Sequence, residues 1–74
     1  MTADYELGDV VIDLTERMDL AGLTVQELSQ RVGITPANLS ILKNNKARGV
    51  RFGTLLAICK ELECEPGDII RLRD

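Results

Sequence analysis

The feature that most constrains this chain of 74 residues is the stretch from residue 24 to residue 44, TVQELSQRVGITPANLSILKN. Apolar residues recur at helical spacing before Gly33, and a second, shorter apolar face follows it. The first face consists of Val25, Leu28 and Val32, and the second of Leu39 and Leu42. Because only residues 33–35 join the two patterns, the helices cannot run side by side, and the sequence predicts the steep crossing of a helix-turn-helix.

Local signals indicate where these two helices begin and end. Thr24 and Glu27 have the spacing of a capping box, which satisfies free N–H groups at the start of the first helix. Gly33 can take the left-handed conformation that ends a helix. Thr35 can cap the second helix, and Pro36 suits its first position, where a missing N–H costs nothing.

The second helix carries small and polar residues on its outer face, and these have the size to enter a DNA major groove. They are Ala37, Asn38, Ser40 and Ile41. Asn38 can make a bidentate pair with adenine, which gives about 1–3 kcal/mol of discrimination, and Thr35 can hydrogen-bond a phosphate at the helix N-terminus. In the alternative interpretation, Thr35 is only a cap and Asn38 only a surface residue.

Charge is distributed unevenly along the chain. The net charge of −3 argues against DNA binding, because phosphate repels an acidic protein. From residue 28 to residue 60, however, the sequence has no acidic residue and six basic ones, namely Arg31, Lys43, Lys46, Arg48, Arg51 and Lys60. Lys43, Lys46, Arg48 and Arg51 are therefore expected to set affinity through phosphate contacts without reading sequence. The alternative is an ordinary solvated surface.

Two further helices flank this central stretch. The first is predicted over about residues 14–21, with Asp13 as its cap and with Leu14 and Met18 in the core. The second is predicted over residues 52–62 from apolar residues at helical spacing. Its expected core stripe is Phe52, Leu55, Leu56, Cys59 and Leu62.

The connections carry their own signals. In the loop before residue 52, Gly49 is expected to take a positive φ and Val50 to pack into the core. Pro66 can begin a short helical turn that runs through Asp68.

The two ends of the chain contain short β-branched runs. Val10 to Ile12 form one run, and Ile69, Ile70 and Leu72 form the other. The two runs can pair antiparallel with each other, or either can add to a sheet in a partner chain. Residues 1–9 are polar and expected to be flexible, which leaves 10–74 as one domain.

The composition excludes several functions. With no histidine, the chain lacks Ser–His and Cys–His nucleophile pairs and the usual zinc sets, so no enzyme, metal or cofactor is expected. Cys59 is predicted to be buried, and the acids around Cys64 disfavour a reactive thiol. No apolar run reaches the ~20 residues of a membrane span. Unpaired cysteines and an acidic start without a signal peptide favour the cytoplasm.

Two segments resemble the phage-repressor (Cro/CI-type) helix-turn-helix family. They are GITPANLSILKNNKAR, from residue 33, and TLLAICKELECEPGDII, from residue 54, and the match covers about residues 11–72. The resemblance implies an all-α, compact, lambda-repressor-like five-helix domain whose third helix, 36–44, reads the major groove. The pairing of the two ends would add a short two-stranded β element to it.

The resemblance also implies roles for individual residues. Thr35, Ala37, Asn38 and Ile41 match positions that contact base edges or flanking phosphates in the family, and Asn44, Lys46 and Arg48 match positions that contact backbone phosphate. The chain departs from the family at Val25, where many members carry a phosphate-binding glutamine that Gln26 can replace. It also has Asn45 where glycine is common, and asparagine tolerates the same backbone region.

Together these observations predict a bacterial transcriptional regulator that binds double-stranded DNA sequence-specifically. We expect a repressor that acts as a homodimer, with one recognition helix in each half-site. No small-molecule ligand is expected. The alternative function is a protein-interaction module on the same scaffold, such as an antitoxin or an adaptor.

Overall fold

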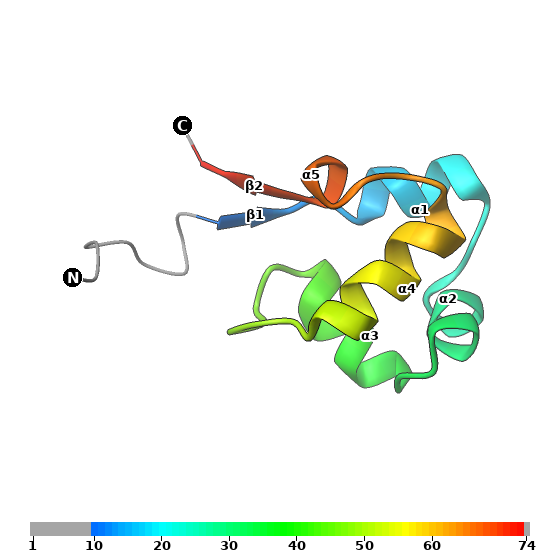
Figure 1. Ribbon diagram of the computed structural model, residues 1–74. Coiled ribbons are helices and arrows are strands. Elements are labelled where there is room, and N and C mark those ends of the chain that lie inside the picture. Colours follow the sequence, from blue (N-terminus) through cyan, green and yellow to red (C-terminus); the bar gives the residue numbers. More distant parts are fainter. Residues whose placement is uncertain (1–9, 74) are drawn as a thin grey trace.

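The computed structural model describes residues 10–73, which form five helices and a two-stranded sheet (Figure 1). In chain order the elements are β1 (Val10–Ile12), α1 (Thr15–Ala21), α2 (Val25–Val32), α3 (Pro36–Lys43), α4 (Phe52–Leu62), α5 (Pro66–Ile69) and β2 (Ile70–Leu72). This is the mostly helical architecture expected from the sequence. The expected flexibility of residues 1–9 lies outside the described residues.

The two strands pair with each other and form a terminal ribbon, β1 with β2, that projects from the helices (Figure 1). The strands are antiparallel, with Val10 opposite Leu72 and Ile12 opposite Ile70. The Asp13 N–H donates to the Ile69 carbonyl at 2.7 Å and continues the ladder toward the helices. Internal pairing is therefore the correct one of the two alternatives.

The start of α1 differs from the prediction. Asp13 was expected to cap this helix, but Leu14 occupies the N-cap position and makes no side-chain cap. The Asp13 carboxylate instead accepts a hydrogen bond at 3.1 Å from the guanidinium of Arg71, in β2. The ribbon brings these two charged side chains together across 58 residues of sequence. A charge-assisted hydrogen bond is stronger than a neutral one, so the Asp13 carboxylate binds Arg71 and does not cap α1.

The helix-turn-helix of α2 and α3 follows the predicted signals closely. Thr24 and Glu27 form both hydrogen bonds of the capping box, each at 3.1 Å. Gly33 ends α2 with a φ of 88°, in the left-handed region. Thr35 caps α3 by accepting from the Asn38 N–H at 3.1 Å, with Pro36 at the first helical position.

The core is aliphatic and receives side chains from every helix. Its fully buried members include Leu14, Leu28, Leu39 and Ile58, and Val50 packs against it as expected. The predicted core stripe of α4 is partly wrong, because Phe52 is 80% exposed and Leu56 is 58% exposed. The buried face of α4 is Leu55, Ile58, Cys59 and Leu62.

Helix geometry explains this error. Leu56 lies about 100° around the helix from Leu55 and so falls outside the buried arc. Phe52 is in phase with that arc, but it is the first residue of α4 and its side chain is exposed.

Two expectations for the connections have different outcomes. The short helix at Pro66 forms and extends to Ile69. The expected positive φ at Gly49 is wrong, because the left-handed residue of the α3–α4 loop is Asn45, with a φ of 63°. Asparagine is one of the few non-glycine residues that adopt this conformation readily.

Candidate nucleic-acid interface

The outer face of α3 is open to solvent, as the sequence predicted. Ala37 and Asn38 are exposed, Ile41 is 45% exposed and Ser40 is half-buried. The opposite face holds the helix on the core through Leu39 and Leu42, which are 0% and 7% exposed. Asn38 therefore has its carboxamide available for an external partner, with α3 fixed behind it.

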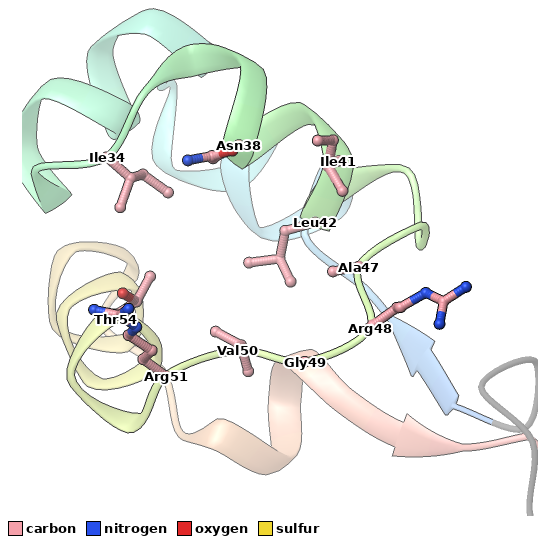
Figure 2. A pocket seen from close by; sticks show the side chains of 10 residues that line it. All are labelled: Ile34, Asn38, Ile41, Leu42, Ala47, Arg48, Gly49, Val50, Arg51 and Thr54. Carbon is pink, nitrogen blue, oxygen red and sulfur yellow. The ribbon is translucent and has the colours of Figure 1, made fainter.

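A groove runs between α3 and the segment that leads into α4 (Figure 2). Leu42 and Val50 point into the gap between the two walls, so its floor is apolar. Arg51 and Thr54 lie together on the wall opposite Ile34, whereas the Arg48 side chain extends outward at one end (Figure 2). The groove has a volume of about 620 Å³, and its lining includes four of the predicted site residues, Asn38, Ile41, Arg48 and Arg51.

The N-terminus of α4 forms part of the second wall. The first-turn N–H groups of a helix have no intrahelical partner and favour an anion nearby. The Arg51 side chain sits at the N-cap and makes no capping hydrogen bond within the described residues. Thr54 adds a hydroxyl to this wall and was missed from the sequence. Its position two residues after the first residue of α4, beside two basic side chains, is the signal that could have identified it.

The basic residues of the central stretch do not all belong to this surface. Among residues 10–73, no salt bridge involves Lys43, Lys46, Arg48 or Arg51. Arg31, by contrast, pairs with Glu61 at 3.6 Å. With Lys60 it lines a second hollow that also contains Glu27, Glu61 and Glu63. The single basic block predicted from the sequence is therefore divided between two places.

The remaining predicted site residues lie around α3 but not in the groove lining. Thr35 is exposed at its N-cap and Asn44 at its C-cap, where the Asn44 N–H donates to the Ser40 carbonyl at 2.9 Å. Lys46 is exposed just beyond, and its N–H donates to the Ile41 carbonyl at 2.9 Å. Gln26 is exposed in the first turn of α2.

Lys43 is half-buried in the last turn of α3, where a cation also complements the helix dipole. It is the predicted phosphate contact with the least exposed side chain. Lys43 and Lys46 therefore lie at the C-terminal side of α3, and Arg48 and Arg51 lie along the loop that follows.

The titratable side chains away from the groove have structural roles. The pKa of Glu27 is lowered, chiefly because its carboxylate accepts the Thr24 backbone N–H in the capping box. Burial raises the pKa of Cys59, which is 5% exposed on the core face of α4 as predicted. Among the described residues, no group of acidic and cysteine side chains is arranged to hold a metal ion.

Comparison with known proteins agrees with this geometry. Residues 13–74 match the Cro/C1-type HTH DNA-binding domain. The chain belongs to this family. It is 55% identical over 64 residues to YozG of Bacillus subtilis (strain 168), described as an uncharacterized HTH-type transcriptional regulator. That match covers 86% of this chain and 76% of YozG.

A solved structure gives the same result for the fold. The crystal structure of the transcriptional regulator VanUg, in form II, superposes with a TM-score of 0.70 at 26% sequence identity. The superposition covers 100% of this chain and 99% of VanUg. Among the helices that the structure describes, none has the length and apolar character required to span a membrane.

Proposed function

We propose that this Cro/C1-type domain is a transcriptional repressor that binds double-stranded DNA sequence-specifically as a homodimer. In this proposal α3 enters the major groove with Asn38 at the base edges. The observation that carries the proposal is the outward face of α3 beside four basic residues that have no acidic partner in residues 10–73. A polyanion is the partner that such a surface fits, because each phosphate contact releases condensed counterions.

The groove between α3 and α4 fits one sugar-phosphate strand. Its floor of Leu42 and Val50 can contact deoxyribose, and its rim carries Arg51, Arg48 and the Thr54 hydroxyl. A positively charged rim fixes the position of the DNA phosphate backbone, and the side chains of α3 then read the bases. Ile41 and Ala37 add apolar surface of the kind that contacts a thymine methyl group.

Two copies would place their α3 helices in half-sites about one helical turn, ~34 Å, apart. Exposed apolar side chains outside the groove, such as Leu56 and Leu72, are available for contact with a second copy. As a repressor, the dimer acts by occupying its operator. Sedimentation with and without a palindromic duplex tests the dimer, and a reporter gene behind the operator tests the sign of regulation.

Selection of bound duplexes from a random pool, followed by a salt titration, tests the proposal. We expect one palindromic consensus. We also expect log affinity to fall linearly with log salt concentration, with a slope that corresponds to about three to five phosphate contacts per subunit. No enrichment, together with no duplex binding at low salt, would contradict the proposal and favour a protein-interaction module on the same scaffold.

A further inference from the structure

We propose that Asn45 is a positioning residue that fastens the α3–α4 loop, residues 44–51, to the terminal ribbon and thereby sets the affinity of the loop for phosphate. The inference deepens the proposed function and rests on it. Asn45 itself was predicted only to tolerate the backbone conformation of its turn. The structure gives its side chain two long-range contacts that the sequence did not indicate.

The Asn45 carboxamide hydrogen-bonds to β1 in the way that a neighbouring strand would. Its Oδ1 accepts from the Ile12 N–H at 3.0 Å, and its Nδ2 donates to the Val10 carbonyl at 3.1 Å. These two groups face away from β2, so they belong to the outer edge of the ribbon. A strand edge of this kind otherwise presents unpaired backbone groups. One side chain therefore satisfies both and joins segments 33 and 35 residues apart.

The backbone of Asn45 is held at the same time. Its φ of 63° lies in the left-handed region, and its N–H donates to the Leu42 carbonyl at 3.1 Å, at the end of α3. The residue is therefore fixed to α3 through its backbone and to β1 through its side chain. Lys46 directly follows Asn45, and Arg48 comes three residues after Asn45. The backbone that carries both basic side chains is therefore held in place at Asn45.

Packing between the loop and the ribbon is incomplete. A small apolar hollow of about 200 Å³ separates the loop from the ribbon and is lined by Ile12, Val50 and Ile70, among others. Because space remains there, the Asn45 hydrogen bonds add a direct connection to the packing of Val50 against the core. A loop that is ordered before it meets DNA loses less conformational entropy on binding. The two Asn45 hydrogen bonds therefore affect affinity for any duplex and leave base reading by α3 unchanged.

Asn45→Gly is the decisive variant, because glycine adopts the same left-handed backbone without strain but lacks the carboxamide. Glu63→Gly is the matched control, since Glu63 also has a positive φ, 53°, at the far end of α4. We expect Asn45→Gly to accelerate hydrogen exchange of the Ile12 amide about tenfold, as an exposed hydrogen bond is lost. Glu63→Gly should leave that amide unchanged.

The binding arm uses the selected duplex and a scrambled duplex of equal length. We expect Asn45→Gly to weaken both by a similar factor, about threefold to tenfold, because only loop order is lost. Unchanged Ile12 exchange, unchanged affinity, or loss restricted to the selected duplex would each overturn the positioning role. If the wild-type chain binds neither duplex, the proposed function is wrong, and so is the proposed effect of Asn45 on affinity. If the wild type binds and Asn45→Gly equals it, only the role of Asn45 is wrong.

Discussion

The salt bridges among residues 10–73 lie on one side of the molecule and are absent from the other. On the side of α1, α5 and the ribbon, Arg17 pairs with Asp68 at 3.4 Å and Arg71 pairs with Asp13 at 3.1 Å. Arg31 pairs with Glu61 where α2 meets the end of α4. Around α3 and the α3–α4 loop, Lys43, Lys46, Arg48 and Arg51 have no such partner within residues 10–73. We call these the paired side and the unpaired side.

The difference explains how a chain of net charge −3 can have a surface for DNA. The acids are concentrated in residues 1–27 and 61–74, and in the described part of the chain three of them pair with arginines, namely Asp13, Glu61 and Asp68. The loop after α3 contains no acid, so its positive potential is not cancelled locally. A local field of this kind steers a polyanion more effectively than the net charge suggests.

The largest effect is expected from removing cations on the unpaired side. Arg48→Ala combined with Arg51→Ala should weaken binding to every duplex about a hundredfold, because two charge-assisted phosphate contacts are lost at about 1.5 kcal/mol each. The salt slope should decrease by about two. Fluorescence anisotropy at several salt concentrations measures both quantities.

A double variant on the paired side provides the control. Arg17→Ala with Arg31→Ala changes the net charge by the same amount but should leave duplex affinity nearly unchanged. Equal weakening by the two double variants would mean that net charge, and not the unpaired side, governs binding.

The next largest effect is expected at Asn38, which separates base reading from backbone binding. Asn38→Ala should weaken the selected duplex about tenfold, within the ~1–3 kcal/mol of a bidentate base contact. Its affinity for scrambled duplexes should decrease little. Competition between the two duplexes measures the ratio directly, and an equal loss on both would refute the base-reading role of Asn38.

A smaller effect is expected on stability, where the same two double variants should rank in the reverse order. The paired-side variant should lose more stability than the loop variant. Arg17→Ala with Arg31→Ala should lower the free energy of unfolding by up to about 1–2 kcal/mol, because it breaks two partly exposed salt bridges. Arg48→Ala with Arg51→Ala should change it by less than about 0.5 kcal/mol. Urea denaturation makes the comparison, and a larger cost from the loop variant would indicate a structural role for the loop arginines.

The smallest effect concerns the capping box of α2. Because the folded pKa of Glu27 lies below its ordinary value of 4.5, ionised Glu27 stabilises the fold above that pH. This stabilisation is lost as the pH falls through the lowered pKa. Glu27→Gln should therefore be less stable than the wild type at pH 6, and the difference should shrink toward pH 3. Thermal unfolding across this range tests it, and a difference independent of pH would exclude the charge of Glu27 as the cause.

The sequence predicted most of the fold because its decisive signals are local. The capping box at Thr24, the stop at Gly33 and the cap at Thr35 each involve residues within four positions of one another. Where a local signal competed with a distant partner it failed, as at Asp13, which binds Arg71 from β2. The prediction for Phe52 was wrong for a related reason, since helical spacing along α4 does not show whether another element covers its first residue.

The candidate site was predictable only in part. The outward face of α3 follows from helical spacing, and its exposed Asn38 agrees with that prediction. The groove does not follow from spacing, because Thr54 and Ile34 become its opposite walls only when the α3–α4 loop folds back. Nor could the sequence separate Arg31 from the loop cations, since its partner Glu61 lies 30 residues away.

Amide NMR mapping of the wild-type chain with its selected duplex shows directly whether DNA binds to the unpaired side. We expect the amide resonances of α3, the α3–α4 loop and the first turn of α4 to shift on binding, and those of α1 and α5 to remain unchanged. Shifts concentrated on α1, α5 and the paired arginines would contradict this expectation.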